Sequence, residues 1–468
     1  MTLFKSLLLG TAAGIVAIAG ASAADLPSKK AAPATYVKIC DAYGAGFFYI
    51  PGTDTCVKVG GYVRVDYDYR PERKGTATVA TTAVLNTAVA NGTTNSAGLA
   101  ASATPADNST SGFYNRGTIQ LDARTPTSMG VARTFMALRL ETGSGPQAKS
   151  ATQPSLEAAY VQWAGFTAGQ GAQPFAYMSS WAYNTHFWGG WPNGVRQLTY
   201  TAVLGGGIST TFGITDAHNY NAVTTAAKDA TNGGTAKTEA FDGPGYNGVI
   251  YVGNVRYDQS WGNVQVMAAG HTGGDLTGGT QNAINNVVGG TKKSGYAVGA
   301  GATFKLPMLA AGDEIQLTAV YADRLANLLA DSGINTPSAS AYGTNPIGGP
   351  SVKFEDGTGW VVGAQLRHYW ASNFRSQVYA SYTSREQNFL TGGVKGSGTA
   401  YSLGKAFIYS PAKDFDIGLE FNYIRAEWDQ AAVRSAQGTT LTVNNMWSVY
   451  PAQSANNYVT KLRIQRNF

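Results

Sequence analysis

Alternation of apolar and polar residues over short segments is the dominant pattern of this chain. In Cys56–Arg70, valines and tyrosines fill one set of alternate positions, while Arg64, Asp66 and Asp68 fall in the other. Successive side chains of a strand point to opposite faces, so this segment predicts a strand with one apolar and one charged face. The chain end, Tyr458–Phe468, alternates in the same way and finishes on an aromatic residue.

Segments of about ten alternating residues recur from Cys56 to the end of the chain, and each of them predicts a strand of this kind. There are sixteen: Cys56–Arg70, Tyr114–Arg124, Gly130–Glu141, Leu156–Ala164, Thr167–Phe175, Arg196–Leu204, Ile208–Asp216, Val249–Asp258, Asn263–Gly270, Tyr296–Leu306, Glu314–Asp323, Trp360–Trp370, Phe374–Arg385, Ala400–Ser410, Phe415–Trp428 and Asn457–Phe468.

The links between these segments alternate in length. Short links such as Gly205–Gly207 and Ala371–Asn373 take turns with long polar links such as Pro71–Phe113 and Arg324–Gly359. Short periplasmic turns and long outer loops produce this asymmetry in transmembrane barrels. The predicted fold is therefore all-β, a 16-stranded antiparallel transmembrane β-barrel whose closure satisfies every backbone group within lipid and leaves an aqueous lumen.

The first residues predict an export signal. Lys5 precedes an apolar run that ends in Ala21-Ser22-Ala23, which is the order of a secretory signal peptide. We therefore expect 1–23 to be removed, 24–55 to form a periplasmic segment and 56–468 to form the barrel. No other stretch is long and apolar enough to predict a transmembrane helix.

Composition adds less than the pattern. The chain has 58 glycines, 26 tyrosines and 13% charged residues, which suits a barrel with tight turns and aromatic girdles but equally a large secreted β-sandwich or β-helix. Its formal net charge of +6 is small for this length and does not indicate a nucleic-acid partner. The alternating chain end favours the barrel, because an edge strand of a soluble sheet would leave an apolar face and an open edge.

The two cysteines predict one disulfide. Cys40 and Cys56 are the only cysteines of an exported chain, and a bridge across a loop of about 15 residues contributes roughly 3 kcal/mol in the chain-entropy account. No further cysteine and no nearby histidine completes a set of metal ligands, so neither a metal nor another cofactor is expected.

The residues from Cys40 to Cys56, followed by Val-Lys-Val-Gly-Gly-Tyr-Val-Arg64, resemble the amino-terminal motif of the alphaproteobacterial general porins. Ala24-Asp-Leu-Pro27 resembles the start of their mature chains, and Phe468 resembles the assembly signal of outer-membrane barrels. The resemblance implies an outer-membrane homotrimer that lets small hydrophilic solutes and ions diffuse through water. It also implies contact with lipid, lipopolysaccharide and the barrel-assembly machinery, and a third outer loop folded into each barrel.

The third long loop, Phe175–Gly194, is rich in aromatic residues and carries no acidic one. We expect it to pack against the inner wall; the alternative is an aromatic slide that stacks sugar rings. The residues expected to line the lumen and its constriction are Arg64, Asp66, Arg116, Arg124, Arg133, Arg139, Lys461, Arg463, Tyr183, His186 and Trp188.

Unopposed guanidinium groups in this lumen would set a positive potential and favour anions weakly. The alternative is that these arginines pair with nearby acids such as Asp68 and Asp122. An enzyme is not expected, because the four histidines are scattered and no hydrolase motif accompanies them. His368 is expected on the outward face of its strand. A substrate-specific barrel and a closed structural barrel remain the alternatives to a diffusion pore.

Overall fold

The computed structural model describes residues 38–71, 75–76, 110–145, 154–178, 181, 183, 194–216, 222–228, 236–242, 249–272, 294–323, 325–329, 354–389, 395–428, 431–435, 446–450 and 453–468. Within these ranges nearly all of the regular structure is strand, with two short 3-10 helices, η1 (Asp41–Tyr43) and η6 (Ala326–Leu329). No helix in the described part of the chain is long and apolar enough to cross a membrane.

Sixteen strands form the wall, as the alternation predicts. They are β2 (Cys56–Arg70), β4 (Thr110–Thr127), β5 (Gly130–Gly143), β6 (Pro154–Trp163), β7 (Phe166–Gly171), β8 (Val195–Gly205), β9 (Ile208–Asp216), β12 (Val249–Gln259), β13 (Gly262–His271), β14 (Gly295–Lys305), β15 (Glu314–Asp323), β16 (Phe354–Ala371), β17 (Phe374–Phe389), β18 (Lys395–Ala412), β19 (Phe415–Trp428) and β22 (Gln453–Asn467).

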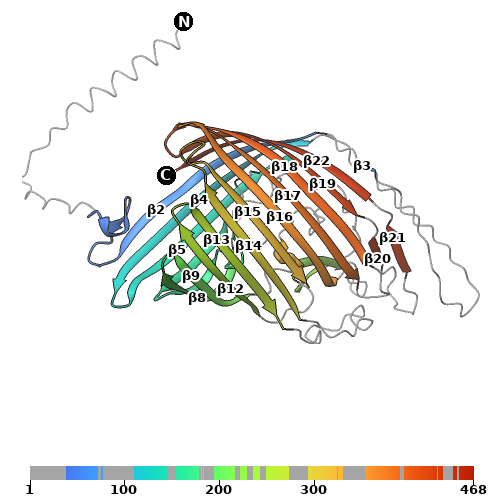
Figure 1. Ribbon diagram of the computed structural model, residues 1–468, viewed down its shortest axis with the longest axis horizontal. Coiled ribbons are helices and arrows are strands. Elements are labelled where there is room, and N and C mark those ends of the chain that lie inside the picture. Colours follow the sequence, from blue (N-terminus) through green and yellow to red (C-terminus); the bar gives the residue numbers. More distant parts are fainter. Residues whose placement is uncertain are drawn as a thin grey trace, which may run out of the picture.

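The wall closes on itself between its first and last strands. Each strand pairs antiparallel with the next one along the wall, and β2 pairs with β4 on one side and β22 on the other. Figure 1 shows these strands tilted side by side around the wall. Phe468 extends the closing seam, because its backbone N–H donates to Gly61 O at 3.0 Å and its O accepts from Gly61 N at 3.1 Å.

The small strands lie outside the main wall or extend it. Strand β1 (Phe48–Tyr49) pairs with β2, and β3 (Gly75–Thr76) pairs with β22. Two separate hairpins pair β10 (Ala222–Lys228) with β11 (Ala236–Asp242) and β20 (Ala431–Ser435) with β21 (Met446–Tyr450). Both hairpins therefore belong to long links between wall strands.

The two faces of the wall differ in polarity. On β2, the side chain of Val63 is on the outer face and is 56% exposed, whereas Asp66 on the inner face is 1% exposed. Aromatic pairs such as Trp261–Phe304 lie on the short-turn side of the outer face, and pairs such as Tyr423–Tyr458 lie toward the opposite end. An apolar outer face with aromatic rings near both ends is the surface that a lipid bilayer accepts.

Two links differ from the sequence expectation. Strand β7 ends at Gly171 rather than at Phe175, because the chain turns at Gln173–Ala176 and leaves the wall. The long link after β15 contains η6, whose Leu328 and Leu329 are 0% exposed. Alternation in sequence does not reveal either change of direction, because both depend on contacts with other strands.

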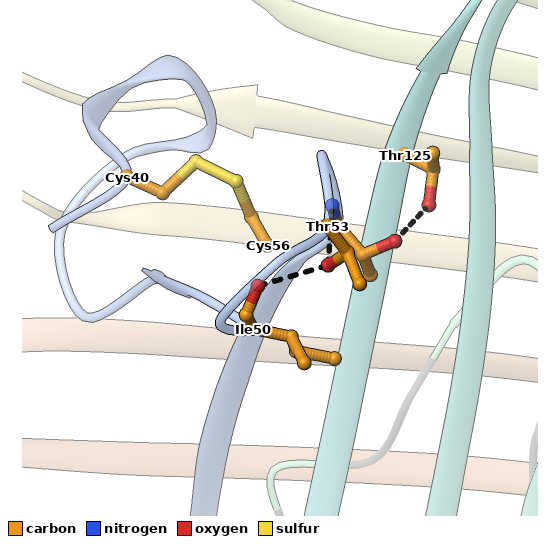
Figure 2. The surroundings of a disulfide bond; sticks show 6 residues. Cys40, Ile50, Thr53, Cys56 and Thr125 are labelled. Carbon is orange, nitrogen blue, oxygen red and sulfur yellow. Dashed lines mark hydrogen bonds between the residues drawn. A yellow bond between two sulfur atoms is a disulfide. The ribbon is translucent and has the colours of Figure 1, made fainter. Parts of the chain in front are cut away.

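The disulfide segment folds at the end of the barrel where β2 begins. Cys40 and Cys56 form the expected bridge, with their Cα atoms 6.1 Å apart, and both are buried together with Phe47. Thr53 Oγ1 donates to Ile50 O at 3.0 Å (Figure 2). The guanidinium of Arg124 lies 4.8 Å from the centre of the Phe47 ring, which ties the segment to β4.

Replacing both Cys40 and Cys56 with serine is expected to loosen this segment and leave the barrel closed. The bridge contributes roughly 3 kcal/mol, whereas β2 keeps its pairing with β4 and β22 in the variant. Hydrogen exchange measured by mass spectrometry will then show faster exchange in 39–50 and unchanged exchange in β17–β19. Equal exchange in variant and wild type would contradict a stabilising role for the bridge.

Candidate functional site in the barrel interior

Loop three, the link 172–194 between β7 and β8, enters the barrel. Its first part lies along the inner wall of β12 to β14: Asn254 Nδ2 donates to Pro174 O at 2.7 Å. The hydroxyl of Tyr177 donates to Asn263 Oδ1 at 2.5 Å and lies 2.6 Å from Thr303 Oγ1. The described start of the loop is therefore pinned to this wall by hydrogen bonds.

Further along the chain, the same loop contacts β16, β19 and β22. The backbone N–H of Trp181 donates to Gln365 Oε1 at 3.1 Å, and that of Tyr183 donates to Glu420 Oε2 at 2.5 Å. The guanidinium of Arg463 lies 4.1 Å from the centre of the Tyr183 ring. Burial raises the pKa of the Tyr183 phenol to about 12.

These contacts confirm that the described part of loop three packs inside the barrel and against its wall. The ring of Trp181 lies under Arg367, whose guanidinium is 4.0 Å from the ring centre. A guanidinium thus covers one face of the Trp181 ring and one face of the Tyr183 ring, which favours packing over a sugar slide. His186 and Trp188, which the sequence also placed at the constriction, lie outside the described residues.

Two tyrosines of the loop region sit where the wall has glycine. A Cβ atom added to Gly301 of β14 would lie 2.1 Å from the Tyr177 ring, and one added to Gly418 of β19 would lie 2.1 Å from the Tyr183 hydroxyl oxygen. The wall thus needs glycine at both positions to receive the loop. Sequence reasoning missed these recesses; glycine at an inward position of an alternating strand is the signal that marks them.

An apolar cluster fills the interior beside β12 to β16. Phe175 of loop three packs there against Leu328 and Leu329 of η6 and against inward residues of the wall. The wall residues are Ile250, Val252, Met267, Ala269, Ala297, Val320, Ala322 and Val361. The inner face of these strands is therefore apolar over part of its length, and the sequence signal is segments apolar on both faces, such as Val249-Ile-Tyr-Val252.

The predicted lumen cations face the interior from β2, β4, β5 and β22, but most of them have a carboxylate partner. Asp122 accepts from Arg124 at 2.8 Å and from Arg133 at 3.0 Å. Arg116 and Arg139 both contact Glu141, at 2.6 and 3.0 Å. Each of these carboxylates thus serves two arginines.

The third shared carboxylate lies next to the closing seam. Asp66 accepts from Arg463 at 2.7 Å, and Lys461 Nζ lies 3.5 Å from Asp66 and 3.1 Å from Asp68. Arg139 also lies 3.8 Å from Glu157 on β6. The expectation of unopposed guanidinium groups is therefore wrong for these cations, because a carboxylate on the same strand or on the neighbouring strand lies beside each of them.

Arg64 is different. Its Nε donates to Gln465 Oε1 at 2.8 Å, and its guanidinium lies 4.9 Å from the centre of the Tyr62 ring. Its contacts within the described chain include no ion pair to a carboxylate. Arg64 is the predicted lumen cation that keeps its charge without a salt bridge in this part of the molecule.

Further arginines on β12, β16 and β17 face the interior in the described part of the chain and were missed. Arg375 contacts Asp416 at 2.7 Å, Arg367 contacts Glu314 at 3.4 Å, and Arg256 contacts Asp258 at 2.9 Å. They occupy inward alternate positions of strands that the sequence predicted. Scoring the charge on every strand, rather than on the strands nearest the seam, would have found them.

Neither a metal centre nor a catalytic group emerges from the described residues. They contain no group of three or more histidine, cysteine, aspartate or glutamate side chains placed to hold a metal ion. His368 lies on the outward register of β16, as expected, and its Nδ1 is 2.5 Å from Asp313 Oδ2 in the turn between β14 and β15. His186 and His218 lie outside the described residues.

Comparison with known proteins agrees with this architecture. A family model described as the porin subfamily matches residues 25–451. Porin Omp2b of Brucella abortus (strain 2308) is 31% identical over 277 residues, which cover 57% of this chain and 65% of the relative. The match thus spans slightly less than two thirds of that relative. Porin Omp2a of Brucella ovis is 59% identical over 63 residues, or 13% of this chain and 18% of the relative.

Among solved structures, the outer membrane channel DcaP of Acinetobacter baumannii covers 90% of this chain and 99% of its own, with a TM-score of 0.52 and 16% identity. At that identity the likeness supports the fold alone. The family match and the Brucella relatives confirm the resemblance to alphaproteobacterial general porins and the expectation that the chain is not an enzyme. The chain belongs to the porin subfamily and is a β-barrel protein of the outer membrane.

Proposed function

We propose that the barrel is a water-filled channel through which small hydrophilic solutes and ions diffuse. The observation that carries this proposal is the inner face of β2, β4, β5 and β22, which is lined by charged and hydrogen-bonding side chains while the outer face is apolar. Charged groups on an inner face need water or a partner, and sixteen strands enclose more space than side chains fill. The apolar cluster lies beside β12 to β16, and loop three crosses the interior from there to Arg463 on β22. The path therefore runs along the polar side, next to the point where loop three reaches β22.

We further propose that the channel prefers anions weakly. Arg124 and Arg133 share the single carboxylate of Asp122, and Arg64 lacks an ion pair to a carboxylate within the described chain. Both features leave positive charge beside the path, and rings of positive charge favour anions in pores. The sharing of carboxylates keeps the excess small, which is why the preference is expected to be weak.

The zero-current potential across a planar bilayer with a salt gradient tests this preference. Purified wild-type channels are expected to give the sign of an anion-preferring pore, and Arg133→Gln is expected to lower the anion-to-cation permeability ratio about twofold, because it removes one charge from the Asp122 pair. Arg425→Gln is the matched control, since Arg425 lies on the outer face beside Glu427. A cation preference in the wild type would contradict the proposal.

A homotrimer embedded in lipid and lipopolysaccharide is part of the same proposal, together with insertion by the barrel-assembly machinery and a periplasmic position for 24–55. Support comes from family membership and from the apolar outer face, which suits both lipid and a second barrel. Native mass spectrometry of detergent-solubilised protein tests the oligomer: a mass of three chains is expected, and a single-chain mass under the gentlest conditions would contradict it.

A further inference from the structure

Arg64 occupies a defined place on the polar side of the interior. It lies on β2 in register with Arg116 on β4 and with Gln465 on β22. The next inward pair toward the outer end joins Asp66 to Arg463, the arginine that contacts the Tyr183 ring of loop three. Arg64 therefore lies beside the point at which loop three meets the wall.

The orientation of the Arg64 side chain is fixed from two sides. Gln465 Oε1 accepts from Nε at 2.8 Å, and the Tyr62 ring lies 4.9 Å from the guanidinium. The hydrogen bond of Arg64 within the described chain uses Nε, so its two terminal nitrogens keep their four N–H groups for another acceptor. A guanidinium held at Nε presents those terminal groups as a planar, preorganised fork.

The acceptors nearest to this fork are already engaged. Glu141 contacts both Arg116 and Arg139, and Asp66 contacts both Arg463 and Lys461. The side chain of Gln465 is committed as well, because its Nε2 donates to Asn467 Oδ1 at 2.9 Å. Arg463 and Arg116 act on Arg64 as like charges, and the carboxylate of Asp66 acts against them.

We propose that the Arg64 fork is a docking point for small carboxylate solutes in transit. A carboxylate is planar and accepts two parallel hydrogen bonds from the terminal nitrogens of one guanidinium, which a spherical chloride ion does not match. Gln465 is the positioning residue, because it holds Nε and so aims the fork. The inference rests on the proposed channel function and adds to it the class of solute that the channel retains.

Single-channel conductance as a function of salt concentration tests the proposal, in potassium acetate and in potassium chloride. A docking point makes acetate conductance saturate at a lower concentration than chloride conductance. Three variants separate charge from geometry. Arg64→Gln removes both, Arg64→Lys keeps the charge without the fork, and Gln465→Glu places a competing carboxylate 2.8 Å from Nε. Arg425→Gln on the outer face is the control.

The half-saturating acetate concentration is expected to rise about fivefold in all three variants and to stay unchanged in the control, since a hydrogen bond of about 1 kcal/mol is worth that factor. Arg64→Gln is expected to shift the zero-current potential further from the wild-type value than Arg64→Lys does, because the lysine variant keeps the positive charge. Acetate conductance that rises linearly in the wild type, or saturates equally in Arg64→Lys, would overturn the docking point while leaving the channel intact. Absence of any conductance would instead overturn the proposed function.

Discussion

Replacing Gly301 and Gly418 together with valine is expected to raise the single-channel conductance roughly twofold, because the wall will no longer accept loop three. A Cβ at either position would lie 2.1 Å from Tyr177 or Tyr183, and contacts that short do not occur between non-bonded atoms. The tyrosine rings must leave their recesses, and the loop they hold then withdraws from the path. Conductance in planar bilayers, with the same salt on both sides, is the measurement.

Gly117→Val supplies the control for added strand bulk. Gly117 lies in β4, on the outer face, and a Cβ there would have no atom within 4 Å. This control is expected to conduct like the wild type. Correct folding of the double variant is checked by its resistance to unfolding in cold detergent. A folded double variant with wild-type conductance would show that loop three does not limit the current.

Deletion of Phe468 is expected to abolish most assembly of the barrel into membranes. The residue contributes two backbone hydrogen bonds to Gly61 at the closing seam, and its ring lies against the space that a Gly61 side chain would occupy. Without it, the N–H and C=O of Gly61 lose their partners at the rim of the wall, and unpaired backbone groups near lipid are costly. The fraction of folded protein in outer-membrane extracts, read from heat-dependent gel mobility, is the measurement.

Phe468→Ala and Phe468→Tyr distinguish the ring from the backbone. The alanine variant keeps both hydrogen bonds to Gly61 and loses the ring. The tyrosine variant keeps the hydrogen bonds and an aromatic ring. If the terminal ring is the assembly signal, the alanine variant will fail like the deletion and the tyrosine variant will assemble. Normal assembly of the deletion variant would contradict both roles of Phe468.

The wall itself could be predicted because each strand carries its own signal. Membrane on one side and water on the other impose a period of two on every strand, so Cys56–Arg70 or Tyr458–Phe468 can be placed without reference to the rest of the chain. The disulfide could also be predicted without the fold, because Cys56 is the only other cysteine in the sequence. The inward position of loop three followed from the family resemblance and from its aromatic residues, which need burial.

The interior could not be predicted to the same degree, because its contacts join distant segments. Tyr183 meets Gly418 and Glu420 more than 200 residues later in the chain, and only the shape of the closed barrel brings them together. The apolar cluster depends in the same way on η6 meeting Phe175. Local sequence does not predict these contacts. Its only sign of them is glycine or leucine at positions where the barrel pattern expects polar side chains.

The carboxylate partners of the arginines could be predicted in part, less well than the wall strands and better than the contacts of loop three. Arg133 on β5 faces Arg124 across the ladder and reaches Asp122 diagonally, so the pairing follows once the register of β4 and β5 is known. The register itself depends on where the turn between them begins, and the strands run up to that turn at Thr127 and Gly130. Residue types alone therefore predicted which cations face the interior. They did not decide whether carboxylates pair with those cations.

The central claim is that the closed barrel conducts ions through its polar side, and single-channel recording of the purified protein tests it most directly. The recording uses a planar bilayer with about 1 M salt on both sides, which screens charge interactions strongly. The account predicts discrete conductance steps that appear in groups of three, with a current that varies linearly with small voltages. Repeated insertion of folded protein with no step at any voltage would contradict a channel and indicate a closed, structural barrel.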